Sequence, residues 1–218
     1  MRERTAAQYL KAIWLLQVQC PAQVTVTSLS YWLSMAPATV SQAIKELCVA
    51  DLVQHERYGP IALTAHGQHI ATVAVRKERV ARAFLFNVLE VPWPRVAEES
   101  SRLSTALSTP LAERMYQEAG SPDNDPYGNP IPGWNGHLHQ PKGTTLVSHD
   151  PGETLRITRV AESNQDLLER FHILGLIPNS TVQIKRIDYA IGVVRVSASV
   201  GEANLGLHTA DRVYAVLS

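Results

Sequence analysis

The chain has 218 residues, in which 20 lysines and arginines balance 20 aspartates and glutamates. Its two cysteines are too few for a disulfide framework, and no Cys-x-x-Cys pair offers a structural zinc site. No apolar run approaches the roughly 20 residues that cross a bilayer, and the N-terminus does not resemble a signal peptide. We therefore expect a cytoplasmic protein without a membrane partner.

The first third of the chain is basic and has the helical pattern of a small DNA-binding unit. Residues 1–82 carry nine basic and five acidic side chains, which favours a polyanionic partner. Apolar residues at helical spacing predict a first helix ending near residue 20 and a second helix with Thr27 and Ser28 as caps. A third helix is predicted to begin at Pro37, since proline lacks the donor that a first helical turn leaves unpaired.

The stretch MAPATVSQAIKEL (35–47) places aliphatic side chains on one helical face and short polar ones on the other. Two short strand-like runs, 52–55 and 61–63, follow it and are joined by a Gly-Pro turn. Helix, turn, helix and hairpin form the layout of a winged helix-turn-helix, whose second helix enters the major groove. The candidate DNA-contacting residues are Thr27, Pro37, Ala38, Thr39, Ser41, Gln42, Lys45 and Arg57.

Two kinds of DNA contact are expected from these residues. The hydroxyl and amide groups of Thr39, Ser41 and Gln42 can reach base edges or phosphates, and glutamine pairs well with adenine. Lys45 and Arg57 would neutralise phosphates, which adds salt-sensitive affinity without sequence information.

The remainder of the chain is predicted to be helical and then β-rich. Thr64 caps a long helix of about residues 65–89, and two more helices are expected at about 95–104 and 109–118. Residues 120–152 are rich in Gly, Pro, Asn, Asp and His, so little regular structure is expected there. Beyond residue 154, short β-branched runs interrupted by one helix, 165–174, predict a small barrel-like domain.

Several segments resemble the diphtheria-toxin-repressor family of metal-dependent transcriptional regulators. They are QYLKAIWLL (8–16), ATVSQAIKEL (38–47), HERYGPIALTAHG (55–67), VAVRKERVARAFL (73–85) and DPYGNPIPG (125–133). The segment LLERFHILGLIPNSTVQI (167–184) is similar to the SH3-like domain shared with FeoA proteins. The resemblance implies a homodimer, paired through the helices after the wing, that binds a palindromic operator in double-stranded DNA and acts as a repressor in metal homeostasis.

The resemblance also implies a fold class and a division of the chain. The fold is a mainly α winged helix-turn-helix and helical dimerisation domain, followed by an all-β SH3-like domain of FeoA type. The predicted segments are a DNA-binding domain at 1–72, a dimerisation domain at 73–135, a linker at 136–152 and the SH3-like domain at 153–218.

The positions that hold metal in this family carry unsuitable residues here. Family members bind Fe²⁺ or Mn²⁺ between the first helix, the long helix and the helix after it. At the matching positions stand Gln8, Lys11, Glu78, Arg82, Ala97, Ser101, Ser104 and Thr105. Serine and threonine hydroxyls are poor ligands for these ions, and an arginine adds a permanent cation. We expect no cofactor; if one binds, it is a divalent transition metal, Mn or Fe.

Two hypotheses explain this loss of ligands. In the first, Lys11 and Arg82 pair with Glu78, Glu98 or Glu99 and hold the DNA-competent geometry without metal. In the second the site has simply decayed, because surface ion pairs usually contribute little.

Weaker metal candidates remain elsewhere in the chain. Glu162 and Gln165 have the spacing by which the SH3-like domain of iron-responsive members donates ligands, although helix capping is the favoured role. His137, His139 and His149 form a second loose group in the linker, for which solvent exposure is the favoured interpretation.

The sequence contains no Gly-rich phosphate loop, nucleophile elbow or HExxH motif, so we expect no enzyme. The favoured function is a dimeric DNA-binding regulator that is metal-independent or has an altered effector. One alternative is a working Fe- or Mn-dependent repressor with non-standard ligands. A second is a protein-interaction module that does not bind DNA.

Overall fold

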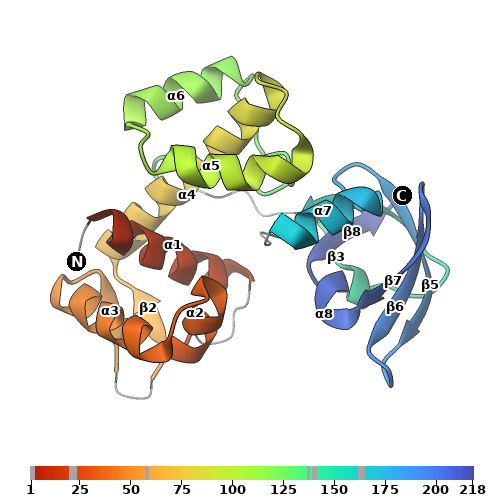
Figure 1. Ribbon diagram of the computed structural model, residues 1–218, viewed down its shortest axis with the longest axis horizontal. Helices are drawn as coiled ribbons and strands as arrows, with labels where there is room; N and C mark the ends of the chain where they lie inside the picture. The colour runs from red at the N-terminus through yellow and green to blue at the C-terminus, as the bar shows by residue number, and fades with distance from the viewer. Residues whose placement is uncertain (1–2, 20–23, 57–58, 137, 139–141, 162–164) are drawn as a thin grey trace. The chain divides into compact units, whose positions relative to one another are not determined.

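The computed structural model describes residues 3–19, 24–56, 59–136, 138, 142–161 and 165–218 (Figure 1). The chain divides into two compact units, and each is described by itself. The first unit comprises Met1–Glu78, Ser104–Leu107 and Pro132–Leu138; the second comprises Arg79–Leu103, Ser108–Ile131 and His139–Ser218. No helix among the described residues is long and apolar enough to cross a membrane.

The first unit is a helix-turn-helix followed by a two-stranded hairpin (Figure 1). Its elements are α1 (Glu3–Gln19), α2 (Val26–Leu33), α3 (Pro37–Val49), β1 (Val53–His55), β2 (Ile61–Leu63) and the first part of α4 (Ala65–Asn87). The two strands pair antiparallel, with Val53 opposite Leu63. Leu10, Ile13, Leu29, Ile44 and Leu47 are fully buried and form the centre of the core. The predicted winged helix-turn-helix is therefore confirmed.

Helix α2 begins with a capping box that lies earlier in the chain than the predicted caps Thr27 and Ser28. The backbone N–H of Ser28 donates to Thr25 Oγ1 at 3.1 Å, and the backbone N–H of Thr25 donates to Ser28 Oγ at 2.9 Å. The cap is thus Thr25, not Thr27 or Ser28, and Ser28 is the third residue of the helix. The alternation of β-branched residues before α2 concealed this cap, because it also suits an extended segment.

The second unit contains helices and a six-stranded antiparallel sheet with the strand order β3-β8-β4-β5-β6-β7. Its helices are the end of α4, the 3₁₀ helix η1 (Trp93–Arg95), α5 (Val96–Ser104), α6 (Thr109–Glu118), the 3₁₀ helix η2 (Leu146–Ser148), α7 (Gln165–Ile173) and α8 (Leu207–Ala210). The strands are β3 (Thr144–Thr145), β4 (Thr154–Val160), β5 (Thr181–Asp188), β6 (Val193–Ala198), β7 (Gly201–Gly206) and β8 (Val213–Leu217). This sheet confirms the predicted all-β C-terminal domain.

One hydrophobic core joins the helical and β-rich parts of the second unit. Trp93 and Tyr127 belong to the same buried cluster as the sheet residues Leu155 and Ile184. Their rings meet edge to face with centroids 4.7 Å apart, and His172 of α7 stacks on Trp93 at 6.0 Å. The SH3-like domain is therefore packed on the helical segment of the second unit through aromatic contacts.

The structure differs from the predicted elements at two further points. The long helix ends at Asn87 rather than near residue 89. In the segment 120–152, where little regular structure is predicted, residues 146–148 form η2, and Thr144 and Thr145 form the edge strand β3, which pairs with Tyr214 and Ala215 of β8. This pairing gives those backbone groups hydrogen-bond partners that local composition could not reveal.

The start of α4 requires a glycine, which gives a test of the fold. A Cβ on Gly67 would lie 2.0 Å from the carbonyl oxygen of Leu52, so a Gly67→Ala variant must displace the backbone. We expect it to lose about 1–3 kcal/mol of unfolding free energy, measured by urea titration, although alanine normally favours a helix. The control is Gly206→Ala, where the added Cβ has open space and the cost is below about 1 kcal/mol. Equal stability of the two variants would contradict the close approach.

Candidate nucleic-acid interface and the metal-site positions

Helix α3 separates its buried and exposed faces as the sequence predicted. Val40, Ala43, Ile44 and Leu47 are buried. The predicted contact residues Pro37, Ala38, Thr39, Gln42 and Lys45 are exposed, Ser41 is half-buried, and Thr27 is exposed on α2. Arg57 lies outside the described residues. Small and polar groups thus occupy a solvent-facing helix surface that a DNA groove can approach closely.

Two features of α3 suit a polyanion at its N-terminal end. Ala36, the N-cap residue, makes no side-chain capping bond, and no acidic residue stands in the first turn. The first backbone N–H groups are therefore not occupied by a side-chain cap and can face a phosphate. Gln42 Nε2 donates to Glu46 Oε1 at 3.3 Å, and this hydrogen bond lowers the pKa of the Glu46 carboxyl.

In the first unit, the positions expected to hold metal form an ion pair instead. Lys11 of α1 donates from Nζ to Glu78 Oε2 of α4, although these residues are 67 positions apart. The side chains are 23% and 8% exposed, so the pair is only partly screened by water. Gln8, one turn earlier on α1, is exposed. The Lys11–Glu78 pair is one of the pairings named in the sequence analysis.

Arg82 has a partner in the second unit, Asp125, that differs from the predicted partners Glu78, Glu98 and Glu99. Its Nη1 donates to Asp125 Oδ2 at 3.0 Å, with the two side chains only 5% and 0% exposed. The guanidinium also lies 5.6 Å from the centre of the Tyr127 ring. Asp125 Oδ1 accepts from the backbone N–H groups of Tyr127 at 3.0 Å and Asn129 at 2.9 Å. A single carboxylate thus neutralises a buried cation and closes the DPYGN turn.

Glu98 and Glu99, the alternative partners of Arg82, form local ion pairs on the surface of α5. Arg102 pairs with both of them, and Arg95 lies 3.5 Å from Glu98. Among the described residues, Arg82 therefore pairs with Asp125 and with neither of these glutamates. Residues three or four apart on a helix meet without any long-range folding, which explains the local preference.

Two further arginines on the same face of α4 bind the following segment. Arg76 Nη1 donates to the carbonyl oxygen of Pro132 at 2.8 Å, and its guanidinium lies 4.5 Å from the Trp134 ring. Arg79 Nη1 donates to the carbonyl oxygen of Pro130 at 2.6 Å. Both side chains are buried. The sequence signal for these contacts was the spacing of three residues between the arginines of α4. This spacing places three arginines on one helical face, and when that face is buried, each arginine needs a partner.

The remaining metal-site positions offer no strong ligands. Ala97 and Ser104 are half-buried, whereas Ser101 and Thr105 are exposed. No group of three or more His, Cys, Asp or Glu side chains suited to a metal ion occurs among the described residues. With Glu78 already paired to a lysine, this donor set does not fit Fe²⁺ or Mn²⁺, which prefer imidazole and carboxylate ligands.

The weaker metal candidates are only partly described. Glu162, His137 and His139 lie outside the described residues. Gln165 donates from Nε2 to Glu169 at 2.8 Å, and its Oε1 is buried without a hydrogen-bond partner among the described groups. His149 contacts Glu153 through Nδ1 at 3.0 Å and Thr144 through Nε2 at 2.9 Å. The ring of His149 is therefore engaged in structural contacts near β3.

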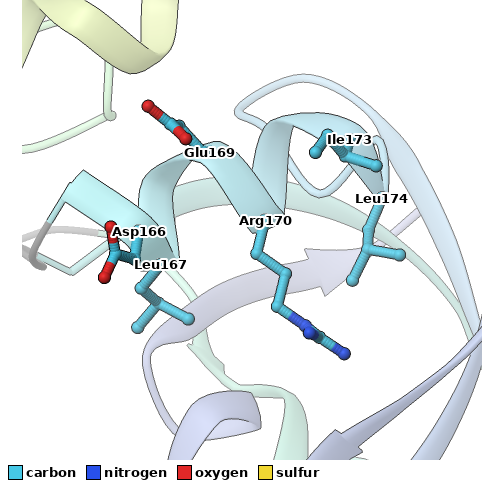
Figure 2. A pocket seen from close by; sticks show the side chains of 6 residues that line it. All are labelled: Asp166, Leu167, Glu169, Arg170, Ile173 and Leu174. Carbon is cyan, nitrogen blue, oxygen red and sulfur yellow. The ribbon is translucent and has the colours of Figure 1, made fainter.

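A pocket lies beside α7, but its polar side chains do not point toward a common centre. It is lined by Asp166, Leu167, Glu169, Arg170, Ile173 and Leu174. Figure 2 shows Glu169 and Arg170 pointing to opposite sides of the helix, with Asp166 beside Leu167. Since these side chains do not converge, the pocket suggests no ligand.

Comparisons with known proteins agree with the fold and with the face of α3, which define a winged helix-turn-helix DNA-binding regulator. A model for the N-terminal DNA binding domain of iron dependent repressors matches residues 2–61, and a model for their metal binding and dimerisation domain matches residues 64–133. A FeoA domain model matches residues 144–216. The chain belongs to the iron-dependent, or diphtheria-toxin-repressor, family, whose members are DNA-binding, dimerising repressors rather than enzymes.

Individual relatives agree with this assignment. The chain is 26% identical to the iron-dependent repressor IdeR of Mycobacterium leprae over 195 residues, which cover 83% of this chain and 84% of the relative. It is 25% identical to the diphtheria toxin repressor of Corynebacterium jeikeium over 175 residues, covering 70% and 73%. A solved structure of a manganese-dependent transcriptional repressor in complex with manganese superposes with a TM-score of 0.88 at 28% identity, covering 98% of this chain and 100% of that one.

The buried ion pair makes a measurable prediction. Asp125→Ala leaves Arg82 without its carboxylate and two backbone N–H groups without an acceptor, so we expect a loss of about 3–5 kcal/mol in urea unfolding. Replacing both residues, with Arg82→Met and Asp125→Ala together, should cost less than the sum of the single changes. Strictly additive losses would show that the two side chains are not coupled.

Proposed function

We propose that this chain is a dimeric repressor that binds a palindromic operator without a metal switch. The Lys11–Glu78 ion pair is the observation that supports this proposal. It joins α1 to α4 at positions where, by resemblance, family members place metal ligands. A lysine ammonium supplies the positive charge from within the chain, so the connection between these helices does not depend on metal concentration.

The size of this contribution follows from burial. Fully exposed ion pairs contribute below about 1 kcal/mol, whereas breaking a buried pair costs about 3–5 kcal/mol. Lys11 and Glu78 lie between these limits, because one side chain is 23% exposed and the other 8%. An effect of about 1–2 kcal/mol on the DNA-competent geometry corresponds to roughly a tenfold change in operator affinity.

The proposed DNA contacts follow the exposed surface of α3. Thr39, Ser41 and Gln42 read base edges in the major groove, and Lys45 contacts a phosphate. Pro37 and Ala38 allow close approach because they are small or compact. Thr27 of α2 and Arg57 of the wing add contacts to the DNA backbone. Two copies related by a dyad would place two such helices on the two halves of a palindrome.

A second candidate function is a metal-dependent repressor with non-standard ligands. It is favoured by the match of residues 64–133 to a metal binding and dimerisation domain, and by the manganese complex among the similar structures. The buried and unpartnered Oε1 of Gln165 is a candidate ligand atom, together with Glu162. An interaction module without DNA binding is the third possibility, and the exposed polar face of α3 argues against it.

The domain boundaries at 72, 135 and 152 stay a prediction.

Measuring operator affinity at controlled metal concentrations tests whether DNA binding requires a metal ion. We expect equal affinity for the protein's own promoter duplex in chelator and after addition of Mn²⁺, Fe²⁺, Co²⁺ or Zn²⁺, measured by fluorescence anisotropy. Lys11→Met should weaken binding roughly tenfold in chelator, whereas the neighbouring exposed change Gln8→Ala should leave it unchanged. Binding that requires one metal would favour the second candidate. An absence of binding under every condition would favour the third.

The roles of the α3 side chains predict two different signatures. Gln42→Ala should cost about 1–3 kcal/mol on the operator and relax sequence preference at one position, because it removes a base contact. Lys45→Gln should weaken operator and random duplex alike and reduce the slope of log K against log salt by about 1. Ala50→Ser, an exposed change beyond the end of the helix, serves as the control. A salt slope that stays constant for Lys45→Gln would show that this lysine does not contact a phosphate.

A further inference from the structure

The hairpin formed by β5 and β6 presents an exposed apolar tip. Tyr189 and Ile191 stand between the two strands and are 70% and 72% exposed. Adjacent exposed apolar side chains gain free energy when a partner covers them. The tip is therefore a candidate contact surface.

The carboxylate of Asp188 makes hydrogen bonds within the turn at the tip. Asp188 Oδ1 accepts from the N–H groups of Ala190 at 3.2 Å and Ile191 at 3.3 Å. Gly192 has a φ of +72°, which only a residue without a Cβ adopts readily. The exposed side chains thus project from an ordered turn, and binding through them would cost little conformational entropy.

Cations flank this tip on both strands. Arg186 of β5 lies directly opposite Arg195 of β6 in the strand register, and Lys185 is exposed at the register shift of β5. Like charges on directly opposite residues destabilise a strand pair. The hairpin 181–198 contains three cations and a single carboxylate, Asp188, in a chain with no net charge. Asp188 Oδ2 accepts one bond from Arg186, which leaves most of the guanidinium donors available.

An apolar tip between cationic strands has the chemistry of a minor-groove contact. Proteins bind the phosphates of a duplex through Lys and Arg, and many proteins that bind the minor groove also insert apolar side chains between base steps. An acidic protein segment would pair with the cations but would offer no apolar site for Tyr189 and Ile191. The combination therefore favours duplex DNA over a protein partner.

We propose that the β5–β6 hairpin is a second DNA contact, distinct from α3. Lys185, Arg186 and Arg195 bind phosphates of the duplex that flanks the operator, and Tyr189 and Ile191 enter its minor groove. This inference rests on the proposed DNA-binding function and adds a site and a partner chemistry to it.

The test compares two duplexes and three variants of the full-length protein. The long duplex carries the protein's own promoter, and the short one is trimmed to the palindromic core of the operator. The variants are Arg186→Gln with Arg195→Gln, Tyr189→Ser with Ile191→Ser, and the control Arg170→Gln, which removes an exposed arginine of the same domain away from the hairpin. Affinity is measured by anisotropy across a salt series.

The proposal gives a distinct result for each variant. On the long duplex, the double arginine variant should lose about 2 units of salt slope, because each lost phosphate contact removes about 0.9. The tip variant should lose several-fold affinity on the long duplex with its salt slope unchanged. Both should match wild type on the short duplex, and Arg170→Gln should match it on both. Hydroxyl-radical footprinting of the wild type should show added protection of minor-groove sugars outside the core.

Several outcomes would overturn the proposal. One is wild-type affinity and salt slope for both hairpin variants on the long duplex, with no protection outside the core. Another is that the tip variant binds DNA normally but no longer binds vesicles of phosphatidylserine and phosphatidylcholine that the wild type binds, which would assign the tip to a membrane surface. If the wild type binds neither duplex, the proposed function itself fails, and this result is distinguishable because it does not depend on the variants.

Discussion

The second unit depends on the buried pairing of one arginine with one aspartate. A guanidinium cannot lose its proton in a protein, so Arg82 at 5% exposure requires a fixed anion. Asp125 supplies it and, with its other oxygen, closes the turn that follows. That turn also binds β4, since the N–H of Val160 donates to the carbonyl oxygen of Tyr127 at 2.8 Å and Asn129 Nδ2 donates to that of Val160 at 3.3 Å. One carboxylate therefore connects α4, the turn and the sheet.

Gly128 shows how closely the turn and the sheet approach each other. Its φ is +80°, and a Cβ there would lie 2.1 Å from the carbonyl oxygen of Thr158. The turn cannot move away from the sheet without breaking these contacts. The position of Asp125 is therefore fixed both by the sheet and by Arg82. Arg82 is thus fixed by structure that has no connection with a metal ion. The resemblance places Arg82 where family members hold a metal ligand, but here its cation takes part in packing. Replacing Arg82 alone with a ligand would therefore leave Asp125 buried without its partner.

Local patterns in the sequence were sufficient for the helix-turn-helix and the C-terminal sheet. The spacing of Val40, Ile44 and Leu47 gave the buried face of α3 and, with it, the exposed polar face, because helical periodicity is a local property. The partner of Arg82 could not be found in this way. Its partner Asp125 lies 43 residues away, in a segment whose composition suggested a loop. Glu98 and Glu99 instead form ion pairs with Arg102, four and three residues away. The contact roles of the α3 residues stay a prediction.

A metal switch needs two states of the protein that differ in their affinity for the ion. In the proposed function, Lys11 fills the electrostatic role at Glu78 in every folded molecule, so the ion has no difference in affinity through which to act at that position. Binding to DNA would then respond mainly to protein concentration, because a palindrome needs two copies of α3. Any remaining effector would have to act on a different equilibrium, such as dimer formation or the packing of His172 on Trp93. In the proposed function, a lysine at this position would therefore change more than affinity, because it would remove the coupling on which metal regulation of the DNA-binding unit depends.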